Sequence, residues 1–242
     1  MNHRGIHMRS QIDTTFDFRS DTPPGKDPDA FNPTLRRYHK LLWSKALPSG
    51  VVFELVDTTA QVYLHHHSDM GEFFLSSDTV VPSFRREHKI AHIINHIPAD
   101  ELDAFITIGY TIGGMMVFPG NRLGRKMTIN GARGFHPRIK DRFDLTVECI
   151  RRHYSSENSP LGETLERYAN FFGLFEDFRG YVEFFLLQDM VVEDFSGVKF
   201  FMPFDDFNTA PLPASREAYV DYKQHAIEFI KARNRRILES CR

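Results

Sequence analysis

The sequence predicts an α+β fold: a single domain in which a small mixed sheet is covered by about six helices. Segments with the two-residue period of strands concentrate in the first half of the chain, and segments with a helical period dominate the second half. No polar linker long enough to separate two domains precedes Pro211. The 242 residues, of which 41% are hydrophobic, are enough for one domain with a substantial core.

The N-terminal part of the chain is expected to be irregular. Residues 1–13 have no sustained periodicity and are predicted to form a flexible tail, so the domain should span residues 14–242. The segment 22–33 contains four prolines, which disfavour helix and predict an extended loop packed over the sheet. Asn32 can cap a helix that begins at Pro33, because proline suits the first helical position.

The next elements follow from the spacing of apolar residues. Residues 51–55 and 72–75 are predicted strands, and residues 84–97 a helix that Pro98 ends. Residues 106–112 alternate between large apolar side chains and threonine or glycine, which predicts a strand. After two glycines, residues 115–118 are apolar on both faces and predict a central strand.

The second half is predicted to be more helical. Helices are expected over residues 139–154 and 174–192, and a third helix between them should begin after a cap at Ser159. Residues 198–202 are a predicted strand. A final amphipathic helix should start at Ser215.

Composition excludes several classes of protein. The formal charge of −2 gives no global basic field for nucleic acid, although local binding stays open. Cys149 and Cys241 are too few for a disulfide scaffold. No long apolar run or signal peptide is evident. We therefore expect a soluble protein of a reducing compartment, the cytoplasm, with no membrane partner.

The segment 118–137 is the densest candidate for chemistry. It runs from a predicted central strand to a helix N-terminus, where backbone amides stabilise anions. Its candidate ligand-binding residues are Asn121, Arg122, Asn130 and Arg133, and His136 is a candidate proton carrier. Neither the dinucleotide fingerprint nor the P-loop pattern is present, so a long connecting loop with glycine turns is the alternative.

Two carboxylates at a predicted strand end form the second candidate. Asp205 and Asp206 follow the strand 198–202, a position where catalytic and Mg²⁺-binding acids often lie. Residues 76–78, Ser-Ser-Asp, occupy a comparable position. Both groups also suit a turn or a helix cap, which we favour for these residue types.

A run of three histidines, 65–67, invites comparison with a metal site. In an extended segment, His65 and His67 share one side and His66 faces the other, so at most two converge. No established metal-binding spacing is present, and an exposed loop or a pH-sensitive contact is the alternative.

Other features favour structural roles. Arginines and acids on the helix 138–152 are interpreted as a solvated face of ion pairs, with a phosphate-binding ridge as the alternative. Cys149 is interpreted as a structural thiol. The excess of phenylalanine predicts a core, although Phe204 and Phe207 beside the acidic pair are candidates for a ligand site.

Four segments carry a resemblance to a known family. They are residues 16–28, 35–44, 109–121 and 200–207, the last of which reads Phe-Phe-Met-Pro-Phe-Asp-Asp-Phe. Together they resemble a bacterial family catalogued as a domain of unknown function, over nearly the whole chain. The resemblance implies one full-length domain of intracellular bacterial type, and it implies no reaction, cofactor or catalytic residue.

These observations lead to competing functional hypotheses. The first is an enzyme or binding protein for a phosphate-bearing ligand, such as a nucleotide or nucleic-acid end, with Asp205 or Asp206 as base or Mg²⁺ ligand. It requires one concave site that unites the segment 118–137 with the acidic pair. The second is a non-catalytic interaction module, in a bacterial stress or phage-defence setting, with an exposed apolar patch around Tyr219, Tyr222 and Phe229. A metal-dependent hydrolase using His65 and His67 is a third.

Overall fold

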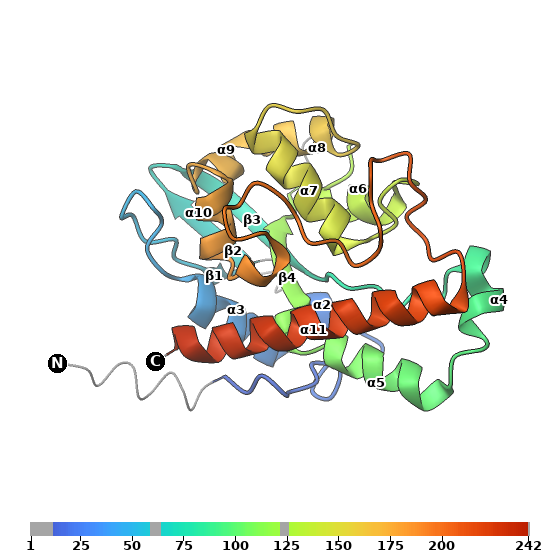
Figure 1. The fold of residues 1–242 in the computed structure, drawn as a ribbon. Coiled ribbons are helices and arrows are strands. Elements are labelled where there is room, and N and C mark those ends of the chain that lie inside the picture. Colours follow the sequence, from blue (N-terminus) through green and yellow to red (C-terminus); the bar gives the residue numbers. More distant parts are fainter. Residues whose placement is uncertain (1–11, 59–63, 122–125, 242) are drawn as a thin grey trace.

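The computed structural model describes residues 12–58, 64–121 and 126–241. Within them the chain forms an antiparallel sheet of four strands and ten α-helices in one body (Figure 1), which confirms the α+β prediction. The strands are β1 (Val56–Asp57), β2 (Leu64–Ser68), β3 (Gly71–Thr79) and β4 (Met115–Pro119). The helices are α2 (Pro28–Phe31), α3 (Pro33–Trp43), α4 (Ala91–Ile94), α5 (Ala99–Gly109), α6 (Ile129–Phe135), α7 (Phe143–Tyr154), α8 (Gly162–Glu166), α9 (Ala169–Gly173), α10 (Phe178–Phe184) and α11 (Arg216–Ser240). Short 3₁₀ turns are η1 (His88–Ile90), η2 (Ile112–Gly114) and η3 (Gln188–Met190).

The sheet has the strand order β1-β2-β3-β4, and every pairing is antiparallel. The prediction of a mixed sheet was therefore wrong. Thr79, where β3 ends, pairs with Met115, where β4 begins. The long connection between them thus leaves and re-enters the sheet at the same end, which makes the two strands antiparallel.

The predicted strand at 106–112 is instead the end of α5 followed by η2. The buried residues of α5 are Leu102, Phe105 and Gly109, which have helical spacing, while Ile106 is only half-buried. Helix α5 packs against α11. Burial of one helical face therefore outweighs the strand propensity of the β-branched residues in this segment.

Other predicted elements are shorter than expected. The predicted strands at 51–55 and 198–202 are reduced to the isolated bridges Ala46–Val52 and Val191–Val198. The predicted helix 84–97 contains only η1 and α4. The predicted helix 174–192 is divided into α10 and η3, because Glu176 and Leu186 have positive φ angles of 67° and 55°.

The Pro-rich segment packs on the sheet as predicted. Asn32 caps α3 by accepting a hydrogen bond from the Leu35 amide at 2.7 Å, with Pro33 at the first helical position. The preceding helix α2 lies against β3, where the Asp29 carboxylate accepts hydrogen bonds from Thr79. Residues 12 and 13 of the predicted tail are described, and Ile12 is buried; the rest of that tail lies outside the described residues.

Helix α11 crosses the molecule beside α5 (Figure 1) and belongs to the core. Ser215 caps it, as predicted. Tyr219, Tyr222 and Phe229 are 0%, 0% and 5% exposed. The exposed patch expected for the interaction-module hypothesis is therefore not formed by these residues, because they pack against the body of the protein.

Most of the phenylalanine excess fills the core, as predicted. Rings pack edge to face or tilted around Trp43, Phe171, Phe175, Phe184 and Phe185. None of the described helices combines the length and apolar character needed to span a bilayer.

Candidate functional site

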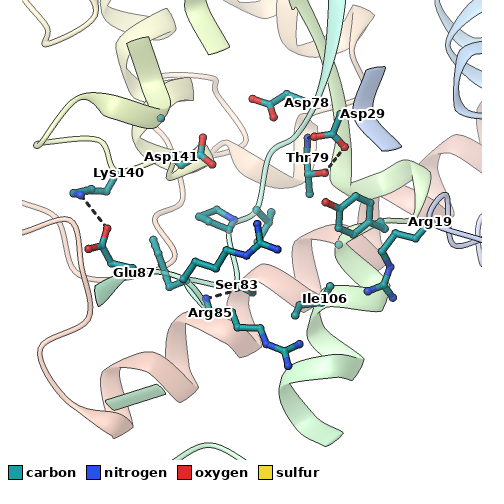
Figure 2. A pocket seen from close by; sticks show the side chains of 17 residues that line it. Arg19, Asp29, Asp78, Thr79, Ser83, Arg85, Glu87, Ile106, Lys140 and Asp141 are labelled. Carbon is teal, nitrogen blue, oxygen red and sulfur yellow. Dashed lines mark hydrogen bonds and ion pairs between the residues drawn. The ribbon is translucent and has the colours of Figure 1, made fainter. Parts of the chain in front are cut away.

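A polar cavity of about 820 Å³ lies between the N-terminal segment, the end of β3, the loop 81–87, the end of α5 and the turn 134–141 (Figure 2). Its charged lining residues are Arg19, Asp29, Asp78, Arg85, Arg86, Glu87, Lys140 and Asp141. Three carboxyl groups gather on one side of the view, at Asp29, Asp78 and Asp141, whereas Arg19 and Arg85 lie on the other side. Cavities with convergent polar groups are the usual place for ligand binding.

A buried arginine holds two of these carboxylates. Arg133, which is 0% exposed, contacts Asp78 at 2.6 Å and Asp141 at 2.7 Å through the same terminal nitrogen. Its other donors bind the carbonyl groups of Val80 and Asp141 and the Thr146 hydroxyl. Burial raises the pKa of Asp78 and of Asp141, although Arg133 opposes the rise. One guanidinium therefore serves two carboxyl groups at the cavity wall.

The third carboxyl group, on Asp29, has no cation within ion-pair distance among the described residues. It accepts hydrogen bonds from the Thr79 amide at 3.1 Å and the Thr79 hydroxyl at 2.7 Å. Burial raises the pKa of Asp29 to about 6, and the negative charges of Asp27 and Asp141 add to the rise. This carboxyl group is thus able to exchange a proton near neutral pH.

We expect the Asp29 carboxyl to make stability depend on pH. The folded protein binds more protons than the unfolded chain between about pH 4 and pH 6, so the free energy of unfolding should fall as the pH rises through this range. The size of this contribution is up to about 3 kcal/mol. Asparagine at position 29 does not titrate, so the Asp29→Asn variant should not lose this stability. The free energy of unfolding of the variant minus that of wild type should therefore rise by up to about 3 kcal/mol from pH 4 to pH 7.

Urea denaturation of both proteins at several pH values measures this difference. Asp27→Asn is the control, because Asp27 is exposed and asparagine also caps helices well; it should keep the pH dependence in a somewhat reduced size, since the Asp27 charge adds to the rise in the Asp29 pKa. A difference between Asp29→Asn and wild type that stays constant with pH would contradict the assignment.

Basic residues surround the other parts of the cavity, and most are paired. Arg19 binds Asp17 and lies over the Tyr110 ring, with its guanidinium carbon 5.3 Å from the ring centre. Arg85 and Lys140 form ion pairs with Asp103 and Glu87. Arg86 is exposed and pairs with no carboxylate among the described residues.

The backbone around the cavity is strained. Phe84, Lys140 and Asp141 have positive φ angles of 57°, 50° and 64°, and all three line the cavity. Side chains larger than glycine rarely adopt this region, and such conformations cluster at functional sites. Here the strain places the Asp141 carboxylate against Arg133, because the Asp141 amide also binds the Arg133 carbonyl at 3.0 Å.

The binding residues predicted from the segment 118–137 have different surroundings. Asn130 donates to the Ser76 hydroxyl at 3.0 Å, and its side-chain oxygen is buried without a partner. The Asn121 carbonyl accepts a hydrogen bond from the Tyr168 hydroxyl. Arg122 lies outside the described residues. The donors of Arg133 are taken by protein groups, so it positions carboxylates and leaves little for a ligand.

The predicted catalytic residues do not line this cavity. His136 ends α6, and its ring nitrogen accepts a hydrogen bond from the Arg138 amide. Asp206 is exposed and accepts hydrogen bonds from the Asn208 amide at 2.7 Å and, through its carbonyl, from the Thr209 amide. The acidic pair Asp205–Asp206 therefore forms an exposed turn, which agrees with the alternative favoured from sequence.

The aromatic residues beside the acidic pair pack on one another and do not form a ligand site in the polar cavity. The Phe204 ring lies 4.3 Å from Phe200 and 5.1 Å from Phe207, and Arg152 lies over Phe207. These four side chains pack on one another, and none of them lines the polar cavity.

Sequence reasoning missed Asp78, Asp29 and Asp141 as a group. Residues 76–78 were interpreted as a turn or cap, but they lie within β3, where Asp78 reaches the cavity. The available signal was weak: Asp78 stands near the end of a strand whose buried residues are Phe73 and Leu75. Nothing local linked it to Asp29 or Asp141.

The histidine run is a strand, β2, and the predicted alternation is confirmed. His66 is buried and contacts the Glu54 carbonyl, while His65 binds Glu72 at 2.9 Å and His67 is exposed on the same side as His65. Across the described ranges, no group of three or more His, Cys, Asp or Glu side chains is arranged to hold a metal ion. The metal-dependent hydrolase and a protein-held Mg²⁺ thus gain no support from geometry.

The face of acids and arginines on α7 is less solvated than expected. Arg142 and Asp144 form a buried pair, and buried Glu148 binds both Arg151 and Arg152. These arginines are held by carboxylates, which agrees with the ion-pair interpretation. Cys149 is buried, and burial raises the pKa of its thiol, as expected for a structural cysteine.

Fold and cavity together define an α+β protein with an acidic and basic polar pocket at the end of its sheet. The chain belongs to a family of unknown function, DUF6994, whose model matches residues 12–237. This match confirms the resemblance to a family without assigned function. A search of curated proteins found no match, and a search of solved structures found none.

Proposed function

We propose that this chain binds a small phosphate-bearing molecule, such as a nucleotide, in the polar cavity, and that the carboxyl groups there perform general acid–base chemistry on it. The observation that carries the proposal is the opposition, across about 820 Å³, of three carboxyl groups and arginine side chains (Figure 2). This site replaces the one first expected from Asp205, Asp206 and His136.

Arginine supports the phosphate part of the proposal. A guanidinium offers donors in a fork that matches phosphate oxygens, and it stays charged at all relevant pH values. Arg86 lines the cavity without a carboxylate partner among the described residues, so its donors are available to a ligand anion. Arg19, Arg85 and Lys140 add positive charge, although each is already paired.

The carboxyl groups support the chemical part. A general acid or base works best when its pKa lies near the working pH. The Asp29 pKa of about 6 meets this condition, and the Thr79 hydroxyl orients that carboxyl group. Asp29 is therefore proposed to accept or donate the proton, while Asp78 and Asp141 keep Arg133 in place.

Thermal unfolding in the presence of a panel of nucleotides and simple phosphomonoesters, with and without Mg²⁺, tests the proposal. A ligand at 100 times its Kd should stabilise the protein by about 2.7 kcal/mol and raise Tm by about 5–10 °C. Arg86→Ala should abolish this shift without lowering the Tm of the free protein, because Arg86 is exposed. A flat response across the panel would remove the proposal.

A cavity-filling variant sharpens the test. Gly109 lines the cavity, and a Cβ added there would meet only the Val81 carbonyl, at an uncrowded 3.9 Å. Gly109→Ala should therefore fold normally but reduce the ligand-induced shift. Gly173→Ala is the matched control, because Gly173 is exposed, ends a helix away from the cavity and has nothing within 4 Å of an added Cβ.

A protein-interaction module, in a bacterial stress or phage-defence setting, is the second candidate. Its support is a set of exposed apolar residues near the β1 edge of the sheet: Val51, Val52, Val56 and Met70. Such residues suit contact with a partner. This candidate expects no response to the phosphate panel, so the same experiment separates the two functions.

The cytoplasm is the proposed location. Its support is that Cys149 and Cys241 are both free and buried, which fits a compartment that keeps thiols reduced.

A further inference from the structure

The charges that line the polar cavity can be paired one by one. Arg19 is paired with Asp17, Arg85 with Asp103, and Lys140 with Glu87. Asp78 and Asp141 share Arg133. Among the described residues, two charged groups of the lining then remain without an oppositely charged partner: Asp29 and Arg86.

The surroundings of Asp29 are deficient in positive charge. Its carboxylate receives two hydrogen bonds from Thr79, which are neutral donors. The nearby acids Asp27 and Asp141 repel its charge. Three carboxyl groups lie on this side of the cavity (Figure 2), and Arg133 pairs with only two of them, those of Asp78 and Asp141. A cation delivered by a ligand would neutralise the excess and form a charge-assisted hydrogen bond.

Among the described residues of the lining, Arg86 carries the unpaired charge of opposite sign, and it is exposed. It follows Arg85 in a loop whose neighbouring residues, Ser83 and Phe84, also line the cavity. A ligand that satisfies both unpaired groups must therefore carry a negative charge at one end and a positive charge at the other. A ligand that fills the cavity removes water from both charges. If it neutralised only one of them, the other would be desolvated without a partner.

We infer that the ligand is a zwitterionic phosphate ester, whose phosphate binds Arg86 and whose protonated amine binds Asp29. This inference rests on the proposed function and adds a substrate class to it. The amine end would lie beside Thr79 and the Arg133-bound carboxylates. Phosphate esters without a cationic group, such as sugar phosphates, would satisfy Arg86 and leave Asp29 unpaired.

Matched ligand pairs test the inference by calorimetry. Each pair consists of an ω-aminoalkyl phosphate and the corresponding ω-hydroxyalkyl phosphate, with two to six carbons between the groups, so the series samples the span between the two sites. At one chain length or more, the amine should bind at least about tenfold more tightly, which corresponds to about 1.4 kcal/mol. The preference should grow from pH 5 to pH 7.5, as Asp29 ionises.

Variants assign the preference to the two residues. Asp29→Asn should bring the amine and the alcohol to equal affinity and leave the alcohol's affinity unchanged, whereas Arg86→Ala should weaken both ligands by the same factor. Asp27→Asn, which changes a neighbouring exposed carboxylate outside the cavity lining, should retain the preference. The wild-type pH profile supplies a second readout if Asp29→Asn does not fold.

The outcomes separate the two proposals. Equal binding of amine and alcohol at every length overturns this inference while phosphate binding stands. Failure of every phosphate to bind overturns both. A preference that persists in Asp29→Asn also overturns the inference, because the amine would then be bound elsewhere.

Discussion

Replacing Arg133 by methionine is expected to lower the free energy of unfolding by about 3–5 kcal/mol. The methionine keeps much of the buried volume but leaves Asp78 and Asp141 at the cavity wall without their shared cation. The carbonyl groups of Val80 and Asp141 also lose their donors. Most single substitutions cost far less, so an effect of this size identifies Arg133 as the support of the acidic wall.

Urea or thermal denaturation measures the loss. Arg138→Met is the matched control: Arg138 is exposed and close in sequence, and its replacement should change stability by no more than about 0.5 kcal/mol. Adding Asp78→Asn to Arg133→Met should recover part of the loss, because one stranded carboxylate is removed. A loss below about 1 kcal/mol for Arg133→Met would show that the carboxylates do not depend on this arginine.

Ending the chain at Ala214, before α11, is expected to abolish cooperative folding. The truncation removes Tyr219, Tyr222 and Ile230, which are all fully buried. It exposes the surfaces of α5 and η2 that pack against α11. It also removes Arg233, whose guanidinium binds the carbonyl groups of Gly113, Met115 and Phe185 in the core. Burial of a single large side chain contributes about 1.5–3 kcal/mol, so loss of the whole helix exceeds the stability of a typical domain.

Circular dichroism and thermal scans of the truncated chain test this expectation, with Val220→Lys as the control. Val220 is 38% exposed on α11, so a lysine there should keep the fold. A truncated chain that unfolds cooperatively but no longer self-associates would contradict the core assignment and would favour the interaction module instead.

Elements with local signals were predictable from the sequence. Asn32–Pro33 and Ser215 start helices because a cap and the first turn involve residues only two or three positions apart. The two faces of the histidine run follow from the strand period alone. The strand β4 was predictable because residues 115–118 are apolar, and all five residues of β4 are buried. Its predicted central position was wrong, because β4 pairs only with β3 and lies at the edge of the described sheet. The phenylalanine core follows from composition in the same way.

The candidate site required contacts between distant parts of the chain. Asp29 and Thr79 are 50 residues apart, and Asp78 and Arg133 are 55 apart. No local pattern specifies such pairs, because they depend on how the strands and helices pack. Arg133 looked like an anion-binding residue in a glycine-containing loop, yet packing buried it and gave it two carboxylates of the protein itself.

The sequence by itself thus determined the α+β class, the helix starts, the alternating faces of β2 and the identity of the core residues. The tertiary structure alone decided that the sheet is antiparallel, that residues 106–109 are helical and that Asp29, Asp78 and Asp141 meet around one cavity. The reason is physical: caps and periodicity act within a turn or a strand, whereas strand direction, burial of one helix face and the sharing of a buried charge depend on partners that packing brings from far along the chain.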